Sequence, residues 1–121
     1  MEQHFRQGDL VFIPVAAIPE KAKKGKDRVL ALGEATGHHH SAISGTKFEV
    51  PGGLIANTIL GASGTPLDLD PSVRAEKFLR VPKRGTTVTH QEHGPIQLPA
   101  GNWMVVIERE YTPVAVRNVL D

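Results

Sequence analysis

The sequence predicts an all-β fold, a small single-domain barrel or sandwich of about seven or eight short strands. Short runs rich in β-branched residues recur between glycines and prolines, and few windows carry the i, i+3, i+4 apolar spacing of an amphipathic helix. No internal repeat or low-complexity tract interrupts this pattern. A chain of 121 residues has the length of one typical domain, so we expect residues 1–121 to form a single β domain.

In the first half of the chain, turn residues separate five apolar runs. A turn at Gly8-Asp9 leads into the first strand, which Pro14 ends because proline cannot donate to a sheet ladder. The turn signal Pro51-Gly52-Gly53 predicts a hairpin between the last two runs. The lysine-rich stretch 20–27 also holds acidic residues, and it is expected to be a solvated loop. The expected strands are 9–15, 28–35, 38–43, 47–50 and 54–60.

In the second half, residues 61–71 are rich in glycine, serine, threonine and proline, and they predict an exposed loop that could act as a mobile flap. Residues 95–101 are expected to be a connector. In the clearest strand, alternation places Val105 and Ile107 on one face and Met104 and Val106 on the other. The three valines of the last nine residues favour an extended tail. The expected strands of this half are 76–81, 86–89 and 102–111.

Charge and composition exclude several classes of function. With 14 basic and 13 acidic residues the formal net charge is +1, so no overall positive field exists to bind bulk nucleic acid or an anionic membrane. The chain has no cysteine, which removes disulfides, thiolate zinc sites and thiol nucleophiles. No segment has the pattern of a signal peptide, and no apolar run approaches the ~20 residues that span a bilayer. These observations predict a cytoplasmic protein without membrane partners.

The histidines are unevenly distributed along this sequence. Five of the 6 histidines lie in two short segments, Gly37-His38-His39-His40 and Thr89-His90-Gln91-Glu92-His93. If the first segment is extended, His38 and His40 share one face of the sheet and His39 points to the other. In the second segment His90 and His93 are three residues apart, so their side chains converge only if the chain turns there.

A divalent metal is the leading hypothesis for these histidines. We expect His38, His40, His90 and His93 to be ligands of a borderline metal such as zinc, iron, manganese or nickel. Glu92 or Glu34 is the expected catalytic carboxylate, acting as base on a bound water in a small metal-dependent hydrolase. This hypothesis requires the two histidine segments, about fifty residues apart in sequence, to meet in space.

Two other hypotheses remain open, so the sequence does not decide whether the protein is an enzyme. In the first, a neutral and a protonated histidine act without metal on a phosphodiester of RNA or a cyclic nucleotide, with Lys47, Lys83 or Arg84 stabilising negative charge. In the second, the chain is a non-catalytic protein-interaction module whose histidines bond backbone groups or sense pH, and whose exposed strands favour a homo-oligomer. The expected partners are accordingly a small-molecule or nucleotide ligand, or another protein chain.

Two resemblances to known families bear on these hypotheses. Gly33-Glu34-Ala35-Thr36-Gly37-His38-His39-His40 and the stretch from Thr89 to Gly101, which follow the patterns GExTGHxH and THxEHGPIxLPxG, resemble a family of small uncharacterised bacterial and phage-borne proteins. That resemblance brings no activity with it. The first segment also resembles the HxH strand of cupins. Cupins place a further histidine after a Pro-x-Gly turn, whereas Pro99-Ala100-Gly101 is followed by Asn102-Trp103, so cupin function is not carried over.

Overall fold

The predicted all-β class is confirmed. A computed structural model describes residues 3–32 and 37–108, and within them ten strands and one short 3₁₀ helix are formed. No helix in these residues is long and apolar enough to cross a membrane. The elements are β1 (Phe5–Gln7), β2 (Leu10–Val15), β3 (Lys23–Lys24), β4 (Val29–Leu32), β5 (His39–Ala42), β6 (Thr46–Ile55), η1 (Ala56–Thr58), β7 (Arg74–Val81), β8 (Thr86–Thr89), β9 (Ile96–Leu98) and β10 (Gly101–Ile107).

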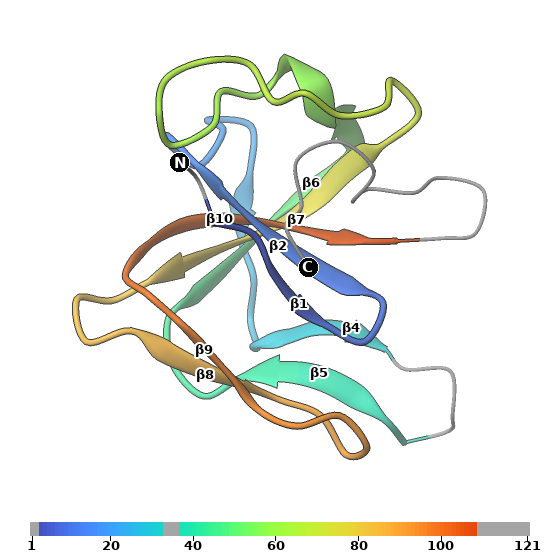
Figure 1. Cartoon of the computed structure of the whole chain (residues 1–121), viewed down its shortest axis with the longest axis vertical. Coiled ribbons are helices and arrows are strands. Elements are labelled where there is room, and N and C mark those ends of the chain that lie inside the picture. Colours follow the sequence, from blue (N-terminus) through green and yellow to red (C-terminus); the bar gives the residue numbers. More distant parts are fainter. Residues whose placement is uncertain (1–2, 33–36, 109–121) are drawn as a thin grey trace.

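The strands form two antiparallel sheets rather than one closed barrel (Figure 1). The larger sheet has the order β1-β2-β10-β7-β6-β3, and the smaller has the order β4-β5-β8-β9. In the smaller sheet Ser41 of β5 lies opposite Thr89 of β8, and Val88 of β8 lies opposite Ile96 of β9. This register brings the ends of the two histidine segments side by side.

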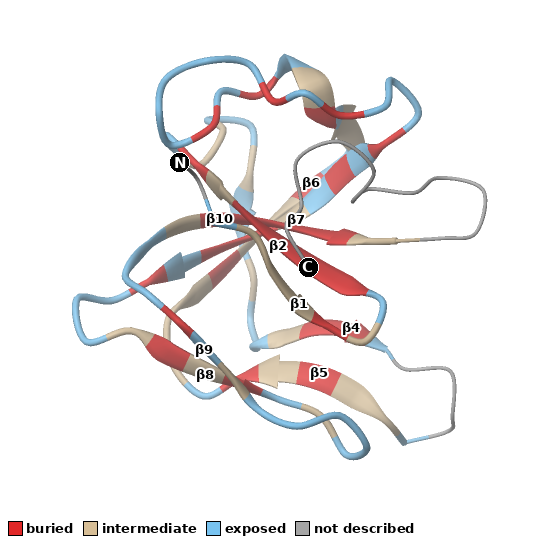
Figure 2. Ribbon diagram, viewed as in Figure 1, coloured by how far each residue is buried: buried red, intermediate tan, exposed pale blue. Residues whose placement is uncertain are grey.

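The central strands of the larger sheet are buried on both faces (Figure 2). Leu10 and Phe12 of β2 pack in a core with residues of the smaller sheet such as Leu30 and Val88, whereas Val11 and Ile13 pack in a second core on the opposite face. Strand β10 is divided in the same way: Val105 and Ile107 pack toward the first core and Met104 and Val106 belong to the second, as predicted. Two covered faces explain the nearly continuous apolar sequences of β2 and β10.

The prediction that residues 61–71 form an exposed loop is wrong for two of its apolar positions. Leu67 is 8% exposed and Leu69 is 5% exposed, and both pack in the second core. Between and beyond them Asp68 and Asp70 remain exposed. This alternation lets a segment without regular strands cover the outer face of the larger sheet, because each leucine removes apolar surface of the sheet from water.

The predicted hairpin at Pro51-Gly52-Gly53 is also wrong. Strand β6 continues through these residues and pairs with β7 on both sides of them, from Thr46↔Arg80 to Glu49↔Lys77 and again at Leu54↔Ala75. The extra residues form an irregularity in the ladder, where Gly52 and Gly53 have φ of 79° and 73°. Glycine accepts this left-handed conformation in a bulge as readily as in a turn, so the motif alone does not distinguish the two.

The observed strands differ from the expected ones because the runs 47–50 and 54–60 contribute to one strand, β6, and because three short strands were not predicted. They are β1, β3 and β9, of 3, 2 and 3 residues. None of the three has a long alternating run, and β3 lies in the lysine-rich stretch predicted to be a loop. These short strands are specified by the strands with which they pair, and a local sequence pattern does not contain that information.

Candidate functional site

The two histidine segments meet, and a turn of the other sheet lies against them. His38 precedes β5 and His40 lies within it, while His90 and His93 follow β8, the strand that pairs with β5. Between β1 and β2, which pair from Gln7↔Leu10 to Phe5↔Phe12, only Gly8 and Asp9 form the turn. Gly8 has a φ of 61°, which suits the first central position of a two-residue type II′ turn.

The histidine cluster is defined here as His38, His40, His90 and His93, and the rings of the other three lie around that of His90. The ring centroid of His90 lies 4.3 Å from that of His40, 4.8 Å from that of His93 and 5.8 Å from that of His38. The rings of His40 and His93 are nearly parallel, at 11°, with their centroids 6.3 Å apart. All four predicted side chains are therefore brought together from two segments of the smaller sheet.

His40 is the buried member of the cluster, with 1% of its surface exposed. Its Nδ1 lies 2.8 Å from Oε1 of Gln7, and its Nε2 lies 3.6 Å from Oδ1 of Asp9. Burial lowers the pKa of His40 from its ordinary value of 6.5; the neighbouring ring of His90 lowers it further, although Asp9 raises it. Burial and the ring of His90 thus favour the neutral form of His40.

His90 uses one ring nitrogen to shape its own loop. The backbone N–H groups of Glu92 and His93 donate to Nδ1 of His90 at 3.0 Å and 3.3 Å. Because Nδ1 accepts both hydrogen bonds, the neutral ring carries its proton on Nε2. The hypothesis that histidines at turns bond backbone groups describes this nitrogen correctly. Nε2 of His90 is then a hydrogen-bond donor rather than an electron-pair donor.

His93 is exposed and lies against Gly8. A Cβ added to Gly8 would be 2.6 Å from Nε2 of His93 and 2.8 Å from its Cδ2. That separation is shorter than a van der Waals contact, so a larger residue at this position would displace the ring from where it lies. The imidazole of His93 and the residue Asp9, which follows Gly8, therefore share the surface beside the β1–β2 turn.

The remaining predicted residues have different positions. Nδ1 of His38 lies 3.4 Å from Oε1 of Glu92, which places this carboxylate at the edge of the cluster. Glu34 lies outside the described residues. His39 turns to Gln91: its backbone N–H donates to Oε1 of Gln91 at 2.8 Å. None of the ring contacts within the cluster involves His39 among the described residues, in keeping with the predicted alternation.

The side chains as they lie do not form a ready coordination shell. In residues 3–32 and 37–108, no group of three or more His, Cys, Asp or Glu side chains is arranged so that it could hold a metal ion. The cations invoked for phosphodiester chemistry lie elsewhere. Lys47 is buried and forms ion pairs with Asp27 and Glu49 at 2.6 Å and 2.9 Å, and Lys83 and Arg84 are exposed between β7 and β8.

Sequence reasoning missed Gln7, Gly8 and Asp9, although they complete the site. The sequence predicted Gly8-Asp9 as a turn into the first strand, without a preceding strand that pairs across it. Apolar and polar residues of Phe5-Arg6-Gln7 precede it, so two short runs flank a two-residue turn with glycine first. That arrangement is a hairpin signal, and it is the one local feature that could have brought these residues to attention.

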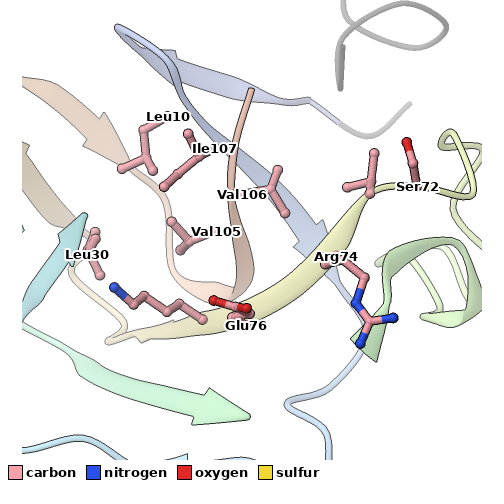
Figure 3. A pocket seen from close by; sticks show the side chains of 10 residues that line it. Leu10, Leu30, Ser72, Arg74, Glu76, Val105, Val106 and Ile107 are labelled. Carbon is pink, nitrogen blue, oxygen red and sulfur yellow. The ribbon is translucent and has the colours of Figure 1, made fainter. Parts of the chain in front are cut away.

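The histidine cluster is separate from the cavity shown in Figure 3. That cavity, of about 290 Å³, opens where β7 and β10 diverge, and it has an apolar wall of residues such as Val105, Val106 and Ile107. Arg74 and Glu76 of β7 provide charged groups at its rim. None of its lining residues belongs to the histidine cluster.

Comparison with known proteins adds a family. Neither a curated protein nor a solved structure matches the chain. One family matches residues 6–108, a range that contains both sheets, the β1–β2 turn from Arg6 onward and every histidine of the cluster. This range is most of the 121 residues, and the match agrees with the resemblance to an uncharacterised family drawn from the two histidine motifs. The chain therefore belongs to the family described as "Domain of unknown function (DUF8820)".

Proposed function

We propose that this protein binds a divalent transition-metal ion, such as zinc, iron, manganese or nickel, beside the β1–β2 turn. The proposed ligands are Nε2 of His40, the imidazole of His93 and the carboxylate of Asp9. One observation carries the proposal. Nε2 of His40 and Oδ1 of Asp9 face each other at 3.6 Å, and the ring proton of His40 is used on the other side of the ring, toward Gln7.

The electrostatics of the site favour a cation. A neutral imidazole nitrogen and an ionised carboxylate both offer lone pairs, so their approach is unfavourable unless a proton or a metal ion lies between them. Glu92 adds a second carboxylate at the edge of the cluster, 3.4 Å from Nδ1 of His38. Imidazole and carboxylate are the ligand types that borderline divalent metals take in proteins.

Closure of the coordination shell requires movement of exposed groups. The arrangement described above does not itself form a three-ligand shell. Asp9 and His93 are both exposed, so their side chains can change rotamer without disturbing the core. His40, in contrast, is fixed by burial and by its bond to Gln7. His40 would therefore define the position of the metal ion, and the side chains of Asp9 and His93 would move to coordinate it.

His90 has a different role in this proposal from the one expected for it. As a neutral ligand through Nε2 it would need its proton on Nδ1, and Nδ1 accepts hydrogen bonds from the backbone N–H groups of Glu92 and His93. Its Nε2–H would instead donate to a molecule bound beside the metal. Hydrolysis with Glu92 as base is a prediction that rests on metal binding. A cytoplasmic location stays a prediction of the sequence.

Metal titration of the untagged protein tests the proposal. After dialysis against a chelator, calorimetry and elemental analysis should show about one equivalent of one of these metals bound per chain, and the melting temperature should rise with metal concentration. At 100 times the dissociation constant, binding contributes about 2.7 kcal/mol to stability. Less than about a tenth of an equivalent of any metal, with no change in melting temperature, overturns the proposal.

Variants identify the ligands. His93→Ala and Asp9→Asn should each weaken binding by more than about tenfold, whereas His39→Ala is the matched control in the same segment and should leave it unchanged. His90→Asn keeps a side-chain oxygen that can accept the N–H groups of residues 92 and 93, so its affinity should remain within about threefold. A loss in His90→Asn as large as that in His93→Ala would support four histidine ligands instead.

A further inference from the structure

Gln7 lies at the junction of the four segments that build the site. It ends β1, only 2% of its surface is exposed, and it makes three hydrogen bonds. Its Nε2 donates to the backbone carbonyl of Val88 in β8 at 3.0 Å and to that of Gly94, after the second histidine segment, at 2.9 Å. Its Oε1 lies 2.8 Å from Nδ1 of His40 in β5.

These contacts fix which way the amide of Gln7 faces. Two backbone carbonyls can only accept, so the NH₂ group must face Val88 and Gly94, and the amide oxygen must face His40. An oxygen at 2.8 Å from Nδ1 of His40 requires a proton on Nδ1, since two lone pairs would otherwise meet. The neutral ring of His40 consequently carries its lone pair on Nε2.

We infer that Gln7 is a positioning residue that selects the Nδ1–H tautomer of His40. The Nε2 lone pair of His40 is thereby directed to the proposed metal ion. The inference rests on the proposed function, since it assigns to Gln7 the orientation of His40, the buried ligand of the proposed metal ion. Metal-bound histidines regularly donate their second ring N–H to a carboxylate, a carbonyl or water, and this bond sets both tautomer and ring orientation. Here the amide oxygen of a glutamine takes that position.

The three hydrogen bonds of Gln7 act on both the protonation of His40 and the position of the loop that carries His90 and His93. The oxygen accepts from a neutral Nδ1–H and carries no full charge, so it orients His40 without stabilising an imidazolium as a carboxylate would. The two donated bonds connect the loop that carries His90 and His93 to the strand that ends beside it. Loss of Gln7 should therefore disturb both the ring of His40 and the loop that carries His93.

The tautomer can be measured without any metal. In the metal-free protein at about pH 8.5, above the ordinary histidine pKa, long-range ¹H–¹⁵N spectra distinguish a protonated from an unprotonated ring nitrogen. We expect wild-type His40 to be protonated on Nδ1, and Gln7→Met, which keeps the length of the side chain and removes the amide, to shift it toward the Nε2–H form. A wild-type His40 protonated on Nε2 overturns the inference whatever the variants do.

Metal affinity gives the second readout. Gln7→Met should bind metal about 10- to 100-fold more weakly than wild type, the usual effect of removing a partner that orients a ligand. Thr86→Val is the control for the loss of a buried hydrogen bond, because Thr86 is 4% exposed and bonds Ser44 rather than the cluster. It should lower stability and leave both tautomer and affinity unchanged.

Gln7→Glu keeps an acceptor for Nδ1 of His40 and loses the two donors. It should retain the Nδ1–H tautomer while it lowers stability, and a switch of tautomer in this variant contradicts the inference. The failures are distinguishable. A wild-type protein that binds no metal overturns the proposed function and leaves the tautomer measurement valid, whereas metal binding with unaltered tautomer and affinity in folded Gln7→Met overturns the role of Gln7.

Discussion

Gly8 shows how one residue without a side chain can determine the geometry of a site. Its φ of 61° lies in the left-handed region, and a Cβ there would lie 2.6 Å from Nε2 of His93. The first property allows the tight turn between β1 and β2, and the second lets an imidazole of the smaller sheet rest on that turn. Both constraints would have to be relieved by any larger residue.

Gly8→Ala should therefore weaken metal binding and stability together. The left-handed backbone costs about 1–2 kcal/mol with a Cβ, and the methyl group must also displace His93. Gly64→Ala is a matched control, since Gly64 has a φ of 90° and a Cβ there would meet nothing within 4 Å. In thermal unfolding, the control should lose about as much stability as Gly8→Ala. Its metal affinity should equal that of wild type. Equal metal affinity in the two variants would show that the contact with His93 is unimportant.

For single residues, the sequence predicted the relative positions of the histidines better than the residues that surround them. Alternation along an extended segment was sufficient to place His38 and His40 on one face, and their rings both contact His90. The protonation pattern could not be predicted, because it depends on Gln7, which is 33 residues from His40 in sequence. Asp9 was missed for the same reason: only the pairing of strands from different parts of the chain brings it to Nε2 of His40.

Among the elements, the chain between β3 and β4 packs against a side chain of β6. Lys47 of β6 is 6% exposed, donates to the carbonyl of Val29 at 3.0 Å and forms ion pairs with Asp27 and Glu49. A Cβ on Gly25 would lie 2.7 Å from Cε of Lys47, so the lysine stem lies directly under the chain between β3 and β4. One buried cation thereby connects β6 of the larger sheet to β4 of the smaller sheet and to the chain between β3 and β4.

The pH dependence of stability should report this cation. The hydrogen bond from Lys47, followed by the backbone bond of Val29, lowers the pKa of Asp27 from 3.8. A lowered pKa means that the stabilisation is present above pH 3.8 and is lost as the pH falls through the pKa of the folded state. Burial opposes the charge of Lys47, yet its bonds to Asp27 and Glu49 raise its pKa from 10.5, so its contribution is present below that value and lost above the raised pKa.

Asp27→Asn is the variant that isolates this effect. Its free energy of unfolding, measured by urea denaturation, should differ from that of wild type by a constant amount between about pH 5 and 9. The difference should shrink below about pH 4, because wild-type Asp27 is then protonated. A difference that persists unchanged in acid would show that the carboxylate charge plays no part.

The mistaken hairpin at Pro51-Gly52-Gly53 illustrates the limit of local signals for elements. Turn and bulge use the same residues, and the choice between them was made by β7, whose 8 residues are long enough to pair with both halves of β6. The long alternating runs were predicted correctly since their own sequences specify them. The shortest strands were not, because each is defined only by a partner elsewhere in the chain.

For the whole molecule, the segment between η1 and β7 is as much a part of the structure as the strands. Ile59, Leu67, Leu69 and Val73 pack against Val11, Ile13 and Met104 of the larger sheet. The sequence predicted the all-β class, yet it could not predict that one sheet has two buried faces. An apolar run such as that of β2 is compatible with either a single strongly apolar face or two covered ones.

Two leucine substitutions in this segment test whether it covers the sheet. Leu69→Ala removes a side chain that is 5% exposed and should lower the free energy of unfolding by about 2–4 kcal/mol, as expected for a buried leucine. Leu60→Ala makes the same change at a position that is 46% exposed and should cost less than about 1 kcal/mol. Equal, small effects in chemical denaturation would instead favour the mobile flap that the composition predicted.

The position of Gln7 and Asp9 has a consequence for how the two sheets hold together. Both residues belong to the larger sheet or its turn, whereas the histidines that they face belong to the smaller one. An ion held by Asp9 and His40 would act as a reversible cross-link between the layers, and its binding energy would be thermodynamically linked to their docking. Amide hydrogen exchange in β5 and β8 would then slow with each increase in occupancy, so the site would set how tightly the domain is closed.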